Sequence, residues 1–155
     1  MEEIKKLNQV HKILDFHVSN NPDNVSVSVD GVSYTNSDIF SKVLSLVGLL
    51  KKNKVTPGDR IAYFAKNSSE FIELMYASSI LGLVMVPINF RLAYEEVKFI
   101  IQDSGSKIII FGEEFKELVE KINFDKTDLQ LSLGISELRK LLKTESPVAF
   151  DVLSS

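Results

Sequence analysis

The fold of this 155-residue chain is decided by the stretch Asn67–Phe111, which reads NSSEFIELMYASSILGLVMVPINFRLAYEEVKFIIQDSGSKIIIF. A helical pattern of apolar residues ends at Gly82, and a short apolar run follows to Val86. A second helical pattern stops near Gly105, before the apolar run Lys107–Phe111. A strand, a helix and a strand joined by short connections form a βαβ crossover, which places the two strands parallel to each other.

The segment before this stretch predicts an antiparallel hairpin. Val25–Val29 alternates apolar and polar residues, Asp30-Gly31 follows, and Val32-Ser-Tyr34 resumes the alternation. Asp-Gly between alternating residues is the strongest short-range hairpin signal. The expected fold is therefore α/β, a mostly parallel sheet with helices on both faces plus an N-terminal antiparallel hairpin.

Further elements are expected as layers around this core. A first helix has Val10, Ile13, Leu14 and His17 on one face. His17 is interpreted as a partly buried structural residue, and a catalytic role is the less favoured alternative.

Local signals also place the remaining elements. Thr35 is expected to cap the second helix. Asn67, with Glu70 three positions later, is expected to cap the helix that follows the strand Arg60–Ala65. The weaker segments expected near the C-terminus are a helix over Phe115–Ile122, a strand over Leu129–Leu133 and a helix over Ile135–Leu142.

Composition excludes several classes of protein. The chain is long enough for one domain with its own core, and 45% of its residues are apolar. A net charge of −3 disfavours a nucleic-acid binder, and the absence of cysteine excludes disulfides and thiolate chemistry. No secretory signal or membrane-spanning run is visible, so a cytoplasmic location is expected, with peripheral membrane contact left open.

Few residues form a recognisable chemical motif. The sequence lacks a Gly-x-Gly-x-x-Gly or Gly-Lys-Ser/Thr loop, a zinc-type histidine spacing and a Gly-x-Ser-x-Gly elbow. The pairs Glu95-Glu96 and Glu113-Glu114 are consecutive at expected helix starts, where they suit the helix dipole better than acid–base catalysis. No catalytic residue and no metal ligand is assigned, and Arg91 is the one conspicuous positive residue in a loop.

The order and spacing of several short strings resemble a known family. These strings are Val32–Thr35, Val55–Ile61, Ala65–Phe71, Leu81–Leu92, Glu95–Val97 and Asp103–Lys107. Together they resemble the N-terminal part of the adenylate-forming enzymes, the acyl-CoA synthetase and AMP-dependent ligase superfamily. The segment Asn89–Leu92, Asn-x-Arg-Leu, points to the acyl-CoA ligase branch. Ala93-Tyr94 departs from the Thr-Pro that relatives often carry, so the cap at this helix start is lost.

The resemblance implies a reaction carried out by a larger enzyme of about 500 residues, with a large N-terminal domain and a small mobile C-terminal domain. With ATP and Mg²⁺ such an enzyme converts a carboxylic (fatty) acid to an acyl-adenylate, and the thiol of coenzyme A then displaces AMP. Arg91 is the only residue to which a ligand role is carried over, a contact to the phosphates of coenzyme A. A structural Arg that bonds loop carbonyls is the equal alternative.

One departure from the family concerns activity. The Ser/Thr/Gly-rich phosphate loop ending in Pro-Lys-Gly, the ribose-binding Asp and the C-terminal Lys are absent from residues 1–155. The chain is therefore expected to be a single α/β domain, an N-terminal fragment that is inactive alone and binds no cofactor tightly. Such a fragment is expected to expose apolar surface and self-associate. The alternative is a non-catalytic α/β interaction or scaffold module.

Overall fold

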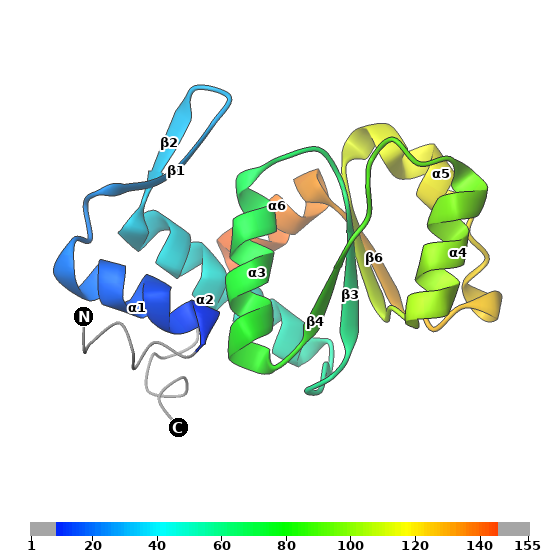
Figure 1. The fold of residues 1–155 in the computed structure, drawn as a ribbon, viewed down its shortest axis with the longest axis horizontal. Helices are drawn as coiled ribbons and strands as arrows, with labels where there is room; N and C mark the ends of the chain where they lie inside the picture. The colour runs from blue at the N-terminus through cyan, green and yellow to red at the C-terminus, as the bar shows by residue number, and fades with distance from the viewer. Residues whose placement is uncertain (1–8, 146–155) are drawn as a thin grey trace.

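The computed structural model describes residues 9–145, which form helices and strands in alternation (Figure 1). In chain order the elements are α1 (Val10–Asn20), β1 (Val25–Val29), β2 (Val32–Thr35), α2 (Asn36–Lys52), β3 (Arg60–Phe64), α3 (Ser69–Leu81), β4 (Val84–Pro87), α4 (Tyr94–Ser104), β5 (Ile108–Phe111), the short 3₁₀ turn η2 (Glu113–Phe115), α5 (Lys116–Glu120), the 3₁₀ turn η3 (Phe124–Lys126), β6 (Leu131–Gly134) and α6 (Ile135–Thr144). The expected α/β fold is confirmed.

The central sheet is parallel and has the strand order β4-β3-β5-β6. Each strand pair lies in parallel register, with Ile61 opposite both Met85 of β4 and Ile108 of β5. The crossover from β4 through α4 to β5 is thus parallel, as the sequence predicts. Its two strands do not pair with each other, because β3 lies between them.

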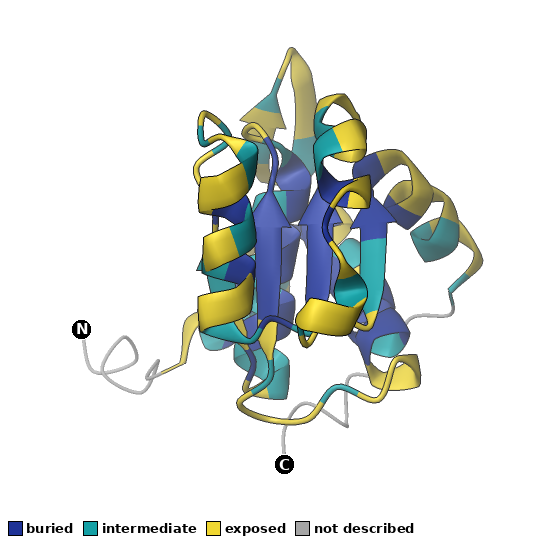
Figure 2. Cartoon of the chain, turned by 90° about the vertical axis from the view of Figure 1, so that its right-hand side faces the viewer, coloured by how far each residue is buried: buried dark blue, intermediate teal, exposed yellow. Residues whose placement is uncertain are grey.

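Helices cover both faces of this sheet, and two separate apolar cores result (Figure 1). Alternate residues of β3 point to opposite faces. Ile61 and Tyr63 pack with α2, α3 and α6 on one face, while Ala62 and Phe64 pack with α4 and α5 on the other. Every residue of β5 is buried, as a strand covered on both faces requires, and Figure 2 shows the central strands buried between exposed helix faces.

The hairpin β1–β2 forms as the sequence predicts and projects away from the central sheet (Figure 1). Asp30 and Gly31 have φ of 50° and 78°, the positive values that a tight two-residue hairpin turn needs. Thr35 and Asp38 then form a capping box at the start of α2: the Asp38 amide donates to Thr35 Oγ1, and the Thr35 amide to the Asp38 carboxylate.

The burial of α1 corrects the sequence-based interpretation. Leu14 is buried as expected, but Val10 and Ile13 are exposed, and His11 joins Leu14 on the inward face. His11 Nδ1 lies 3.0 Å from Ser79 Oγ on α3. His17 is exposed, so its expected partial burial is wrong. The helix packs against α2 and α3 along one narrow stripe. That stripe contains His11 and Leu14 and leaves out His17.

Two further sequence expectations are corrected at helix ends. Ser68, rather than Asn67, is the N-cap residue of α3, and neither forms a side-chain cap. The Ser68 hydroxyl instead lies 2.8 Å from the Tyr63 hydroxyl, a partner from β3 that local sequence does not reveal. The helix expected over Phe115–Ile122 is shorter, because a 3₁₀ turn forms its start and α5 ends at Glu120.

Candidate functional site

The carboxyl ends of the parallel strands form one candidate site, because ligands of open α/β sheets bind in the crevice outside these ends. A pocket of about 340 Å³ lies here, between the ends of β3 and β4. Its lining includes Tyr63, Asn67 and Phe71 on one side and Asn89 and Phe90 on the other. The side-chain amides of Asn67 and Asn89, beside these aromatic rings, could form hydrogen bonds with an uncharged polar group of a ligand.

Arg91 lies in the loop beside this pocket, between β4 and α4. The loop is held by Asn89, whose side-chain oxygen accepts a hydrogen bond of 3.0 Å from the Arg91 amide. The exposed guanidinium lies 5.3 Å from the centre of the Phe90 ring. Among residues 9–145 it has no carboxylate partner, so its N–H donors are available to an anionic ligand.

An acidic turn after β5 closes the other side of the same edge. The carboxylate of Glu113 accepts a hydrogen bond of 2.9 Å from the Ser136 amide and so caps α6, a helix distant in sequence. Gly134 leaves the room for this contact, because a Cβ there would lie 2.6 Å from Glu113 Oε1. The carboxylate of Glu113 therefore has a structural role as the cap of α6.

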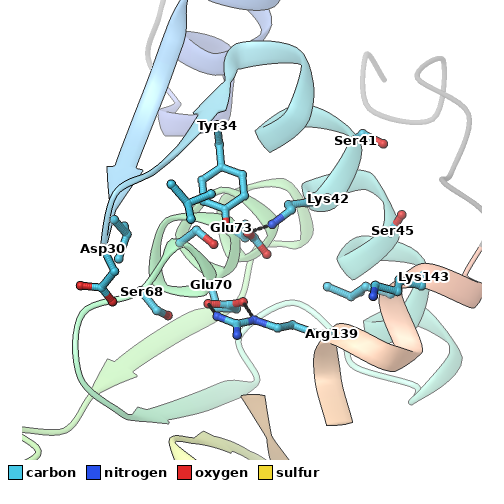
Figure 3. A pocket seen from close by; sticks show the side chains of 14 residues that line it. Asp30, Tyr34, Ser41, Lys42, Ser45, Ser68, Glu70, Glu73, Arg139 and Lys143 are labelled. Atoms are coloured by element: carbon cyan, nitrogen blue, oxygen red, sulfur yellow. Dashed lines mark hydrogen bonds and ion pairs between the residues drawn. The ribbon is translucent and has the colours of Figure 1, made fainter. Parts of the chain in front are cut away.

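A second and larger pocket, of about 510 Å³, lies under the hairpin (Figure 3). We call it the hairpin pocket; its lining residues are Val29, Asp30, Val32, Tyr34, Ser41, Lys42, Ser45, Ser68, Ser69, Glu70, Glu73, Arg139, Leu142 and Lys143. Its volume falls within the range of about 300–1,000 Å³ found for small-molecule sites. The hairpin supplies one wall, and α2, α3 and α6 supply the others.

The first of two ion pairs in this pocket joins α3 to α6. Glu70 is 2% exposed, and both its carboxylate oxygens accept hydrogen bonds from the guanidinium of Arg139, one of them at 3.2 Å (Figure 3). Burial, the largest single influence, would by itself raise the pKa of Glu70. The hydrogen bonds from Arg139, Ser68 and the Glu70 amide, together with the charge of Arg139, outweigh burial and hold the pKa below its ordinary value. Glu70 is therefore a buried anion at neutral pH.

The second ion pair joins α3 to α2 and is less complete. Glu73 is 1% exposed, and its nearest cation is Lys42 Nζ at 3.3 Å. That ammonium group also lies 4.1 Å from the centre of the Tyr34 ring. Burial raises the pKa of Glu73 above its ordinary value, and the nearby charge of Glu70 adds to the rise. Two buried carboxylates thus lie side by side with opposite pKa shifts.

The described residues offer a group for an anion but no cluster of metal ligands. Within residues 9–145 no group of three or more His, Asp or Glu side chains is placed to hold a metal ion. Arg91 is an exposed guanidinium with no acidic partner among residues 9–145, and such a group has the charge and the donors that a phosphate requires. In the same residues no helix is both long and apolar enough to span a membrane.

Sequence reasoning singled out Arg91, whose ligand role stays a prediction, and missed the hairpin pocket. Glu70 was expected to belong to a helix cap, whereas its partner is Arg139, 69 positions away. One signal was present, since Glu70 and Glu73 are spaced to share one face of a helix that is otherwise largely apolar. Two acids on a buried helix require partners, but only the folded chain identifies them.

The fold defines an α/β protein of the open, parallel-sheet class. Within that class, the AMP-binding enzyme family matches residues 14–152, so the chain belongs to this family. The resemblance to adenylate-forming enzymes, and to their acyl-CoA ligase branch, is confirmed by the relatives below.

Two curated relatives and two solved structures illustrate the relationship. The chain is 32% identical over 121 residues to the fatty acid–[acyl-carrier-protein] ligase ScoC of Streptomyces coeruleorubidus, covering 78% of this chain and 23% of ScoC. It is 45% identical over 80 residues to the long-chain-fatty-acid–CoA ligase FadD13 of Mycobacterium tuberculosis (strain ATCC 25618 / H37Rv), covering 52% and 15%. The N-terminal domain of FACL13 from Mycobacterium tuberculosis superposes with a TM-score of 0.83 at 27% identity, over 93% of this chain and 39% of that one.

The second structure, a Mycobacterium tuberculosis fatty acyl CoA synthetase, gives a TM-score of 0.82 at 28% identity, over 91% of this chain and 29% of that one. The chain therefore spans about a quarter or less of the length of these two curated relatives.

Proposed function

We propose that residues 1–155 are the N-terminal part of an ATP-dependent acyl-CoA synthetase that activates a carboxylic acid as its acyl-adenylate. The observation that carries this proposal is the 45% identity over 80 residues to a long-chain-fatty-acid–CoA ligase. The parent enzyme would use ATP, Mg²⁺ and coenzyme A on a fatty acid in the cytoplasm. Adenylation suits this chemistry because a carboxylate is a poor electrophile and AMP is a good leaving group.

We further propose that this chain has no ligase activity alone. The absence of a phosphate loop from its sequence supports this, as does the lack of a metal-binding cluster within residues 9–145. ATP–pyrophosphate exchange is the test, with the parent enzyme and the 155-residue chain assayed side by side on a panel of acids. Exchange by the parent alone is expected. Turnover by the short chain would refute its inactivity, and a parent inactive on every acid would refute the ligase.

Arg91 is proposed to contact the phosphates of coenzyme A in the parent. Its exposure and its lack of an acidic partner among the described residues support this role. Arg91→Ala is expected to raise the KM for coenzyme A and to leave pyrophosphate exchange unchanged. Lys98→Ala, on the helix after the loop, is the control. An unchanged KM for coenzyme A would leave Arg91 a structural residue of the loop.

A non-catalytic interaction module is the second candidate. Exposed apolar side chains favour it: Phe99 on α4 is 64% exposed and Val84 on the edge strand β4 is 47% exposed. We propose that the 155-residue chain self-associates through such surface. Sedimentation of the chain over a concentration series tests this, and a monomer at every concentration would contradict it. The codons after Ser155 separate the two functions, since a Gly-rich Ser/Thr loop ending in Lys favours the ligase and a native stop codon favours the module.

A further inference from the structure

The charges of the hairpin pocket are arranged unevenly between its floor and its mouth. The carboxylates of Glu70 and Glu73 form the floor and are 2% and 1% exposed, whereas the side chains of Lys42 and Arg139 are 34% and 54% exposed. A molecule that enters from solvent therefore meets the cationic groups first. The carboxylates beneath them are already engaged.

These cations retain unused hydrogen-bond donors. Arg139 uses two N–H groups on Glu70, and a guanidinium carries more than two. Lys143 lies one helical turn further along α6 and also lines the pocket (Figure 3). Within residues 9–145 it has no ion-pair partner. Two cations on one helix face can hold one anionic group between them by charge-assisted hydrogen bonds.

The opposite wall of the pocket is apolar. Val29 and Val32 of the hairpin and the ring of Tyr34 line it, and Leu142 adds an apolar group on the α6 side. Val32 remains 52% exposed, so this wall has no covering element among the described residues. Asp30, at the tip of the hairpin, is the acid that faces the mouth, and Figure 3 shows it on the side away from Lys143. An apolar body could pack here while its anionic head reaches α6.

We propose that the hairpin pocket binds a small amphipathic anion, an apolar chain or ring carrying one carboxylate or phosphate head. The head would contact Arg139 and Lys143, and the body would cover Val32 and Tyr34. The pocket is lined by residues other than those around Arg91, and this binding requires neither ATP nor coenzyme A. It can therefore succeed or fail independently of the proposed ligase activity.

The test is an NMR titration of the ¹⁵N-labelled 155-residue chain with sodium octanoate below its micelle-forming concentration. Octyl phosphate distinguishes a carboxylate head from a phosphate head. Octanol and octylammonium carry the same apolar body with a neutral or positive head. Saturable amide shifts at Val32, Tyr34 and Lys143 are expected with the anions, with binding by octanol and octylammonium at least about fivefold weaker.

Two lysines of α6 provide a matched pair of variants. Lys143→Gln is expected to weaken octanoate binding about fivefold. Lys140→Gln makes the same charge change at an exposed position outside the pocket and is expected to leave binding unchanged. Val32→Glu, which places a carboxylate in the apolar wall, is expected to weaken binding about tenfold or more.

Several outcomes would overturn the proposal. Equal binding of octanoate and octanol would show that no anion site exists, and tighter binding of octylammonium would assign the floor carboxylates to a cation instead. Equal effects of the two lysine variants, or no saturable shift with either anion, would also refute it.

Discussion

Replacement of Arg139 by Met tests the ion pair at the floor of the hairpin pocket. Met keeps most of the apolar stem of Arg139 and removes the guanidinium, which leaves the carboxylate of Glu70 buried without its cation. Removal of one partner from a buried pair costs about 3–5 kcal/mol. Because Arg139 is half exposed, water can reach the vacated position, and we expect about 3 kcal/mol at pH 7, near the lower end of that range.

The loss should depend on pH with a defined sign. The pKa of Glu70 is lowered in the folded chain, so the pair stabilises fully above the unfolded pKa of about 4.3 and is lost as pH falls through the folded value. Without Arg139, burial is the dominant influence and raises that pKa. The variant therefore takes up a proton on Glu70 at mild acidity. Its stability deficit should be largest at pH 7 and shrink toward pH 4.

Urea denaturation followed by far-ultraviolet circular dichroism at pH 7, 5.5 and 4 measures this deficit, at protein concentrations low enough to avoid association. Lys140→Met is the matched control, because it makes the same type of change at an exposed position of α6. The double variant Glu70→Leu with Arg139→Met should recover most of the loss, since an apolar pair can replace a buried ion pair at little cost. An Arg139→Met deficit equal to that of the control, or one that does not change with pH, would refute the reasoning.

Three further changes have defined outcomes. Burial raises the folded pKa of Glu73, so the stability that this group contributes is present below its ordinary pKa and is lost as pH rises. The unfolding free energy of Glu73→Gln should therefore rise relative to that of the wild type between pH 4 and pH 7 in the same urea assay. A difference that does not change with pH would contradict this. Gly134→Ala should displace the Glu113 cap and lower the unfolding free energy by about 1 kcal/mol, but cost much less in a Glu113→Ala background. Ala93→Ser should stabilise the chain by about 1 kcal/mol in thermal melts, because the backbone at this N-cap is already extended, with φ −81° and ψ 167°, and lacks only the side-chain oxygen. An unchanged melting temperature would contradict this expectation.

Residues within a few positions of each other determined much of the fold. Asp30-Gly31 specified a hairpin because a tight turn needs two positive φ angles, and these residues adopt them readily. Gly82 and Gly105 ended α3 and α4 in the left-handed conformation, with φ of 67° and 60°. The continuous apolar run of β5 indicated a strand covered on both faces. Each of these signals involves residues that are close together in sequence, so it can be recognised without the tertiary structure.

The tertiary structure alone decided which elements meet. The position of β3 between β4 and β5 depends on how the crossovers pack, and both strands pair with it in register. Tertiary packing buried His11 rather than His17, because α2 and α3 select one stripe of α1. It also joined Glu70 to Arg139 and so built the floor of the hairpin pocket. Contacts of this kind link residues far apart in sequence, and their free energy appears only when the chain has closed the intervening loop and removed water from both partners.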